Sequence, residues 1–307
     1  MTFRVAFQME PMEATNPAET HTLALMREAQ DRGFEVWHFT PRDVLLRGEQ
    51  VIATARRVAL YLERTPHFTH GAPETLDLRT LDVILIRQDP PFNMEYITST
   101  YKLEMLKGEV LVVNDPAAIR NLPEKLYPFR FVRFMPPTLV TYAQAEVDAF
   151  RAAQGDIVVK PLYGFHGHGV AHIHAGDSYE LPDNLMEPLM FQKYLAEIKE
   201  GNKRVIFIDG EVDKAIVTVP EAGEFRVYRN STDHAYTLNV RDWEICRAIG
   251  EDLKKQGLLF VGIDMIGDYL TEINVTSVGS IRRINSIYGG KCEARVWDAI
   301  VQRRRSS

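Results

Sequence analysis

Three oxygen-bearing side chains, Asp264, Glu272 and Asn274, lie in FVGIDMIGDYLTEINVTS (residues 260–277), a segment that otherwise looks like a buried β-hairpin. If residues 267–269 form the loop, Asp264 pairs with Glu272, and all three side chains share one face. A two-residue loop would place the two carboxylates on opposite faces. Opposed carboxylates repel unless a cation lies between them, and two carboxylates with one amide suit Mg²⁺ or Mn²⁺ rather than zinc. The alternative is an exposed polar face on an edge hairpin.

A second candidate site lies in VVKPLYGFHGHGV (residues 158–170), where Lys160 precedes a loop containing Gly164 and Gly167. Glycines let backbone N–H groups turn toward an anion, and a neighbouring lysine adds a point charge for phosphate. The segment is neither a Walker loop, because no Gly-Lys-Ser/Thr follows, nor a dinucleotide fingerprint. The alternative is a plain hairpin turn with two solvated histidines, His166 and His168.

The charged segment FQKYLAEIKEGNKRVIFIDGEV (residues 191–212) is the third candidate. We expect one strand to end at Leu195 and the next strand to open with Arg204. The connection between them would be a hinge whose backbone groups can meet an adenine edge, and Arg204 is suited to binding phosphate or carboxylate. The alternative is a hairpin with a charged surface.

Arg87 and Asp89 are the fourth candidate, in RQDPPFN (residues 87–93). This stretch follows a predicted strand, and ligands of open α/β sheets bind beyond the carboxyl ends of the strands. Arg87 would hold a substrate carboxylate and Asp89 a substrate amine. The alternative is a structural ion pair between these two residues.

The hydrophobic pattern predicts that these candidates are carried by two kinds of unit. In the first 122 residues, buried strands and a helix that stops at Gly33 form the αβ pattern of a small open sheet. Asn93 is expected to cap a helix after Pro90-Pro91. The predicted strands are FRVAFQM (3–9), FEVWHF (34–39), LDVILIR (81–87) and EVLVVND (109–115).

The remaining chain is predicted to be α+β, with antiparallel strands around a polar site. An amphipathic helix that stops at Gly257 precedes the carboxylate hairpin. The other predicted elements are a helix in AQAEVDAFRAAQG (143–155) and strands in DIVVKPL (156–162) and GEVDKAIVTV (210–219).

Composition narrows the class of protein. A chain of 307 residues with 45% apolar residues can bury the cores of about two domains, and a net charge of −6 disfavours a nucleic-acid surface. The sequence has no apolar run of 18 residues and no signal-peptide pattern, so no membrane association is expected. Cys246 and Cys292, without metal-ligand spacing, favour a reducing cytoplasm.

The order of these features resembles the ATP-grasp fold and, more closely, the bacterial glutathione synthetase family. The resemblance covers nearly the whole chain and is carried by LDVILIRQDPPFNMEYITSTYKLE, VVNDPAAIRNLPEKL, IVVKPLYGFHGHG, YLAEIKEGNKRV and FVGIDMIGDYLTEINVTS. It implies an N-terminal open α/β (pre-ATP-grasp) domain at residues 1–122, followed by an ATP-grasp fold. The ATP-grasp fold would have a central subdomain at residues 123–190 and a C-terminal subdomain with the metal site at residues 191–307.

The resemblance implies an ATP- and Mg²⁺-dependent ligase, with Mn²⁺ as the alternative ion. It would join γ-glutamylcysteine to glycine through an acylphosphate and release ADP and phosphate. Lys160 and Arg204 would be the catalytic residues, and Asp264, Glu272 and Asn274 would hold the metal. The implied ATP contacts are Lys125, Lys160, Gly164, Gly167, Gln192, Lys193, Tyr194, Leu195 and Glu200. The implied substrate contacts are Arg87, Asp89, Arg226, Ser277 and Arg282.

The chain departs from the family pattern where donor, acceptor and lid are expected. After GEFR (223–226), the family's glycine-rich lid is replaced by VYRNSTDHAYTL (227–238), which contains no glycine. Thr218 stands where the family has a basic residue, and Asn202 stands at the ribose-side acid, which leaves Glu200 as a substitute. The other departures are Tyr163, His166 and Ser277-Val278-Gly279.

Three functions therefore stay open. The first is a glutathione-synthetase-like ligase, the second is a sister ligase with another acyl donor or amine, and the third is a non-catalytic ATP-binding protein. Retention of Lys125, Lys160 and the three metal ligands argues against the third. The family suggests a homo-oligomer with small-molecule substrates.

Overall fold

The N-terminal part of the chain is an open sheet in which the four neighbouring strands β2, β1, β7 and β8 run parallel. The computed structural model of the protein describes residues 2–165, 167–227 and 230–306, so His166 and two residues of the predicted lid lie outside it. The strand order is β3-β4-β2-β1-β7-β8, with β5 and β6 paired to β4. The strands are β1 (Arg4–Gln8), β2 (Glu35–Phe39), β3 (Val44–Arg47), β4 (Gln50–Leu60), β5 (Phe68–His70), β6 (Glu74–Asp77), β7 (Val83–Ile86) and β8 (Leu111–Val113).

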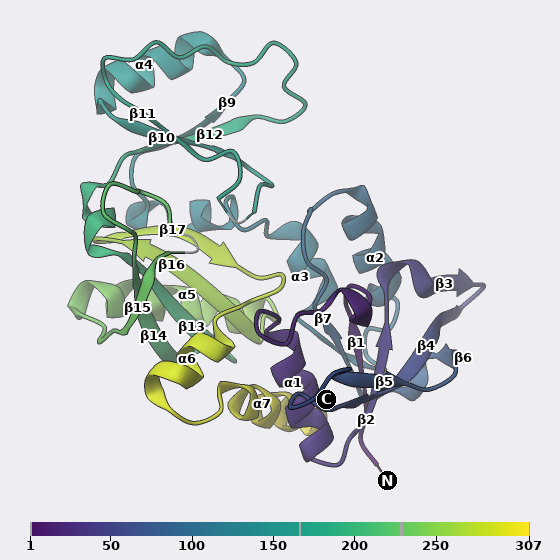
Figure 1. The fold of residues 1–307 in the computed structure, drawn as a ribbon. Coiled ribbons are helices and arrows are strands. Elements are labelled where there is room, and N and C mark those ends of the chain that lie inside the picture. Colours follow the sequence, from purple (N-terminus) through teal and green to yellow (C-terminus); the bar gives the residue numbers. More distant parts are fainter. Residues whose placement is uncertain (1, 166, 228–229, 307) are drawn as a thin grey trace.

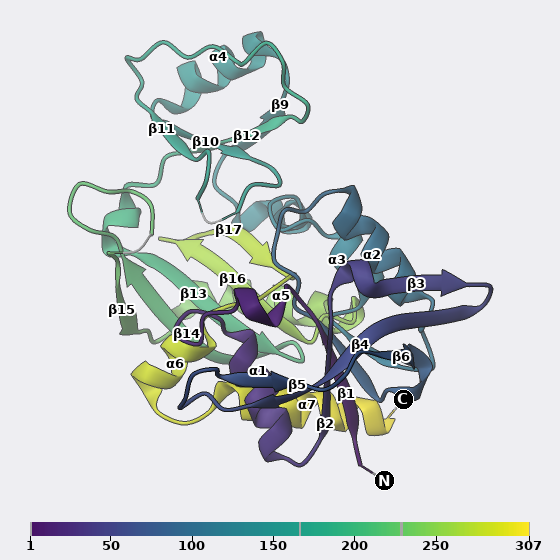
Figure 2. The ribbon, with the colours of Figure 1, turned by 45° about the vertical axis from the view of Figure 1, so that its right-hand side comes forward.

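Helices cover both faces of this sheet (Figures 1 and 2). Helices α2 (Met94–Glu104) and α3 (Pro116–Asn121) pack on one face. Helix α1 (Thr22–Asp31) packs on the other. The predicted cap of α2 is confirmed, because the Asn93 side chain accepts a hydrogen bond from the Tyr96 amide at 3.0 Å. Short 3₁₀ helices are η1 (Met12–Ala14), η2 (Pro41–Asp43) and η3 (Leu78–Thr80).

A four-stranded antiparallel sheet stands apart from the rest of the molecule at the top of Figure 1. Its order is β11-β10-β12-β9, and α4 (Gln144–Gln154) closes one face over a small apolar core. The opposite face carries Lys160 and Gln192. The strands are β9 (Thr138–Thr141), β10 (Ile157–Pro161), β11 (Ala171–Ile173) and β12 (Leu189–Lys193).

The C-terminal sheet is antiparallel, with the order β15-β14-β13-β16-β17. Helix α5 (Val240–Lys255) and the 3₁₀ segment η4 (Tyr127–Phe134) pack on its outer face. The strands are β13 (Asn202–Ile208), β14 (Glu211–Val219), β15 (Thr232–Ala235), β16 (Phe260–Ile266) and β17 (Tyr269–Asn274); α6 (Ile281–Tyr288) and α7 (Cys292–Ser306) follow.

Two predictions about residues 191–212 are wrong. The strand β12 ends at Lys193 rather than Leu195, and β13 opens at Asn202, two residues before Arg204. Nor is the segment a hairpin, because β12 and β13 belong to different sheets and η5 (Ala196–Glu200) connects them. The connection is thus a hinge between two sheets.

The predicted subdomain boundary between residues 190 and 191 also needs correction. It cuts through β12, which pairs with β10 and β9 along its length, so the boundary is better drawn after Lys193. The rest of the division into three parts stays a prediction.

The last helix packs against the first domain. The Trp297 indole of α7 is fully buried, lies 6.2 Å from the Phe7 ring and 5.5 Å from the Phe34 ring, and donates to the Leu25 carbonyl at 2.8 Å. One apolar cluster therefore contains residues of the N-terminal sheet, α1, the C-terminal sheet and α7. Among the described residues, no helix is long and apolar enough to cross a membrane.

Candidate active site

The register of the β16–β17 hairpin brings the predicted carboxylates together. Asp264 pairs with Glu272, and Gly262 pairs with Asn274, as the sequence predicts. The predicted three-residue loop is wrong, however, because β17 starts at Tyr269 and the turn is only two residues long. A β-bulge at Thr271 supplies the extra residue that restores the register.

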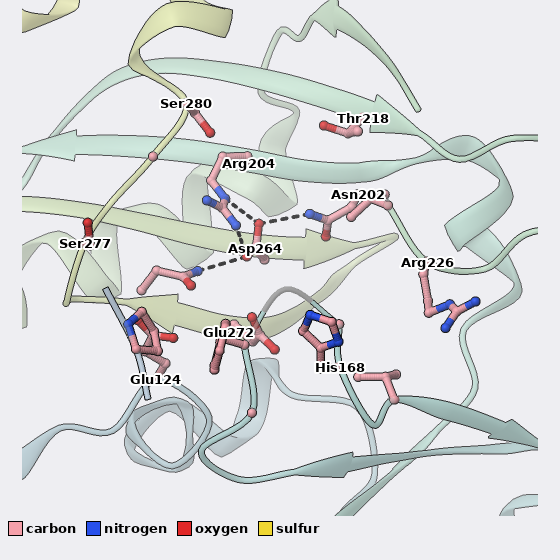
Figure 3. Close-up of a pocket in the computed structure, with 18 of the residues that line it drawn as sticks. Glu124, His168, Asn202, Arg204, Thr218, Arg226, Asp264, Glu272, Ser277 and Ser280 are labelled. Carbon is pink, nitrogen blue, oxygen red and sulfur yellow. Dashed lines mark hydrogen bonds and ion pairs between the residues drawn. The ribbon is translucent and has the colours of Figure 1, made fainter. Parts of the chain in front are cut away.

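One face of the hairpin is apolar and the other is polar, because successive side chains along each strand point to opposite faces. Ile263, Met265, Ile273 and Val275 are fully buried in the core beneath α5. The three oxygen-bearing side chains instead line a cavity of about 1240 Å³. Figure 3 shows Asp264 at its centre, below Arg204 and beside Asn202. The alternative of an exposed polar face is wrong, since only 5% of Asp264 is exposed.

Asp264 is held by three donors. The Arg204 guanidinium binds both carboxylate oxygens, each at 2.6 Å, and the amides of Asn202 and Asn274 each donate at 2.9 Å. Burial favours the neutral acid, but Arg204 and the two amides hold the pKa of Asp264 below its usual range. The carboxylate is therefore ionised at neutral pH.

Two lysines lie beside Glu272. The Lys125 ammonium donates to the Gly164 carbonyl at 2.6 Å and lies 3.7 Å from a Glu272 oxygen. The Lys160 ammonium donates to the Gln192 side chain at 2.7 Å. Burial is the main cause that lowers the pKa of Lys160, and the charge of Lys125 adds to it, although Glu272 acts in the opposite direction. A polyanion bound between these ammoniums would offset their mutual repulsion.

The carboxylate hairpin fits a hard divalent cation. Asp264, Glu272 and Asn274 are oxygen donors from adjacent positions of two paired strands, and all three line the same cavity. The two lysines and the glycine loop line that cavity too, so phosphate groups and a metal would be neighbours there.

The hinge residues Gln192, Lys193, Tyr194 and Leu195 all line the cavity. Glu200 does not, because it is exposed at the end of η5. The sequence prediction for Glu200 therefore needs correction, and Asn202, which faces Asp264, takes the place at the cavity wall.

Arg87 is a buried cation at the other end of the cavity. Its guanidinium donates to the Thr22 hydroxyl at 3.0 Å and to the Val278 carbonyl at 2.8 Å, rather than to Asp89. Burial lowers its pKa to about 10, so it stays charged at neutral pH. Asp89 also lines the cavity. Both predicted residues are thus available to a ligand, and the predicted ion pair between them is not formed.

Of the three remaining predicted substrate contacts, two line the cavity and one does not. Arg226 and Ser277 line the cavity, and Arg226 also binds Glu224 at 3.0 Å. Arg282 does not line the cavity, because its exposed guanidinium turns to the Pro17 carbonyl. Its neighbour Arg283 does, and binds Asp233 and Thr218. The structure therefore brings Arg283, rather than the predicted Arg282, to the cavity; both lie in the first turn of α6, which follows the left-handed residue Ser280.

Glu124 is a cavity residue that sequence reasoning missed. It is half-buried, and the Thr276 hydroxyl donates to it at 2.6 Å. Burial is the largest cause that raises its pKa, and the charge of Glu272 adds to it. Its position directly before Lys125, a predicted ATP contact, was the sequence feature that could have indicated a place in the cavity.

Comparison with known sequences identifies the family. Residues 3–120 match the family model of the prokaryotic glutathione synthetase N-terminal domain, and residues 124–289 match that of the prokaryotic glutathione synthetase ATP-grasp domain. The chain belongs to the prokaryotic glutathione synthetase family. The glutathione synthetase of Rhodopseudomonas palustris is 43% identical over 312 residues, which cover 99% of this chain and all of the relative. That of Salmonella typhimurium is 37% identical over 98% of both chains.

Solved structures share the fold at low identity. An ATP-grasp ligase from Chryseobacterium gregarium, solved with ADP and with leader and core peptides, superposes with a TM-score of 0.68 at 16% identity and covers 99% of this chain and 97% of its own. A D-cycloserine synthetase gives 0.67 at 14% identity over 98% and 99% of the two chains. The predicted ATP-grasp fold behind an N-terminal α/β domain is confirmed.

Proposed function

We propose that this protein joins γ-glutamylcysteine to glycine and converts ATP to ADP and phosphate, as an ATP-grasp ligase. One observation carries the proposal within the family: the hairpin carboxylates, two buried lysines and Arg204 all line one cavity between the two ATP-grasp sheets. This is the set of charges that phosphoryl transfer to a carboxylate requires.

The phosphates of ATP would lie between the two ATP-grasp sheets. Lys125 and Lys160 bind them, and the loop with Gly164 and Gly167 covers them. Asp264, Glu272 and Asn274 would hold Mg²⁺, or Mn²⁺ in its place, and the ion would supply positive charge beside the phosphate oxygens. The adenine lies against residues 192–195.

The donor carboxylate would react at the Arg87 side of the cavity. Arg87 offers charge to a donor carboxylate, while Asp89 is placed for an amine. The donor carboxylate attacks the γ-phosphorus, which gives an acylphosphate and ADP; the amine of glycine then attacks the acyl carbon, and phosphate leaves. Because water would hydrolyse the acylphosphate, the cavity would have to exclude water while the acylphosphate is present.

Arg204 has a double task in this scheme. Its guanidinium neutralises Asp264 through two hydrogen bonds. Arg204 would bind the transferring phosphoryl group once a metal held by Asp264 supplied the compensating charge in its place. We further propose a cytoplasmic enzyme that acts as a homo-oligomer, as the family and the two unpaired cysteines suggest.

Phosphate release tests the proposal. Purified protein is given Mg²⁺-ATP with γ-glutamylcysteine and glycine together, and with each omitted. Release that needs both substrates, with the tripeptide seen by mass spectrometry, supports it. ATP binding without release under these conditions would overturn the named reaction and favour a sister ligase with another donor or amine.

A further inference from the structure

A second cluster of metal-ligating side chains lies outside the cavity, at the edge of the four-stranded sheet. Asp156 immediately precedes β10, and His172 and His174 lie on or just after the edge strand β11. Val158 pairs with His172 across the two strands, and Ile157 pairs with Ile173. This register places His172, His174 and Asp156 on one face.

The ligand atoms lie at suitable distances for one ion. An Asp156 carboxylate oxygen is 3.0 Å from Nε2 of His172 and 3.1 Å from Nδ1 of His174, and all three ligand atoms lie within 4.8 Å of one another. Two atoms that each lie about 2.1 Å from a metal are about 3.0–3.4 Å apart at octahedral or tetrahedral angles. Small side-chain shifts would therefore complete the site.

Neighbouring groups hold two of these ligands in place. The His172 ring stacks on Tyr194 at 3.9 Å with an interplanar angle of 11°, and the Ala175 amide donates to the second Asp156 oxygen at 3.0 Å. Such outer contacts orient the ligands of natural metal sites. That amide and the His174 ring keep the pKa of Asp156 low, so its carboxylate is ionised.

Access to the cluster is open on one side. The His174 side chain is 64% exposed, whereas the His172 side chain is 14% exposed. An ion can therefore enter from solvent past His174, and water can fill the positions that the three protein ligands leave open.

We infer that Asp156, His172 and His174 form a binding site for one transition-metal ion of the zinc type. Two imidazoles and one carboxylate suit Zn²⁺, Co²⁺ or Ni²⁺ rather than the Mg²⁺ of the oxygen-lined cavity. The inference does not depend on the proposed ligase reaction, because no cluster residue lines the cavity.

A bound ion would link the two strands of the β10–β11 hairpin at its open end, where β10 begins and β11 ends. The closed end of the same hairpin is the loop that contains Gly164 and Gly167. Tyr194, which stacks on His172, forms part of the cavity wall. The ion would thus fix the open end of the hairpin and, through the ring contact of His172, the hinge residue Tyr194.

Titration with Zn²⁺ in a calorimeter, in excess Mg²⁺ to fill the oxygen sites, tests the inference. We expect one saturable Zn²⁺ per chain in the unchanged protein. Its affinity should fall at least about 100-fold in His174→Ala and in Asp156→Asn. Both residues are partly exposed, so these variants should fold. With Co²⁺ in place of Zn²⁺, visible absorption bands should appear and be lost in the same variants.

His234→Ala is the matched control, because His234 is exposed on β15 and lies outside the cluster. It should bind Zn²⁺ like the unchanged protein. No saturable binding by the unchanged protein, or equal binding by His174→Ala and the unchanged protein, would overturn the inference. The cluster would then be a pair of histidines hydrogen-bonded to a carboxylate and nothing more.

Discussion

Asp264 shows how one buried carboxylate can be ionised before any metal arrives. Arg204 and two amides satisfy its oxygens, so side chains of the protein itself compensate its charge. Glu272, its partner across the strands, is held only loosely, by Lys125 at 3.7 Å. At the residue scale, Glu272 is therefore the carboxylate with the larger capacity left for a cation.

Glu272→Gln should lower kcat/KM for ATP turnover by at least about 100-fold, because the variant loses a charge that would face the metal and phosphates. The protein should stay as stable as before, since Glu272 is not in the core. Glu251→Gln, at an exposed position of α5, is the control. Unchanged phosphate release by Glu272→Gln would exclude Glu272 as a metal ligand.

Arg204→Ala should destabilise the ligand-free protein by about 2–4 kcal/mol, because it leaves Asp264 buried and uncompensated. Millimolar Mg²⁺ should restore part of this loss in the variant, since the ion replaces the lost charge. Chemical denaturation with and without Mg²⁺ measures both effects. Arg241→Ala, which removes a surface pair with Glu244, should cost little. The same loss with and without Mg²⁺ would argue against a metal at Asp264.

His21 should make the folded state sensitive to acid. Burial, together with Arg87 and Arg283, lowers its pKa from 6.5 to about 4 in the folded protein. Between these two values the unfolded chain binds a proton that the folded chain does not. The free energy of unfolding is therefore complete above pH 6.5 and falls by about 1.4 kcal/mol per pH unit as pH decreases toward 4.

Denaturation midpoints measured from pH 7 to pH 4 check this expectation. In His21→Gln that slope should decrease, because glutamine does not titrate. His67→Gln is the matched control. If both variants keep the full slope, other groups cause the acid sensitivity.

At the scale of elements, the sequence predicts strands and faces better than loops. Alternation of apolar and polar residues places Asp264 and Glu272 on the cavity face, because Ile263 and Ile273 are buried on the other face. The bulge at Thr271 carries no such signal, and neither does β15, which forms inside the predicted lid segment. Arg283 was missed because its direction depends on where α6 begins.

The hairpin loop between β10 and β11 gives a test at this scale. Gly169 has a φ of +73°, and a Cβ there would lie 2.7 Å from a Pro161 side-chain carbon. Gly169→Ala should therefore strain the loop by about 1–2 kcal/mol and weaken ATP binding by about 10-fold. Gly176→Ala is the control, because its Cβ would meet open space without a positive φ. Equal ATP affinity in both variants would show that this loop does not contact the nucleotide.

At the scale of the whole molecule, the C-terminal helix α7 packs against the N-terminal domain. Trp297→Ala should lower the free energy of unfolding by about 3–5 kcal/mol, because it empties a fully buried position shared by α7, α1 and the N-terminal sheet. Trp243→Ala, at a position that is 40% exposed, should cost far less. Urea denaturation measures both. Similar losses in the two variants would mean that α7 contributes little to the first domain.

The position of α7 has a consequence for biosynthesis. Domains generally fold as units while the ribosome extends the chain, starting from the N-terminus. Here the helix that seals one face of the first sheet is translated after both ATP-grasp sheets. The apolar surface beneath α7 must therefore stay uncovered until every described strand has emerged, a period in which a chaperone has something to bind.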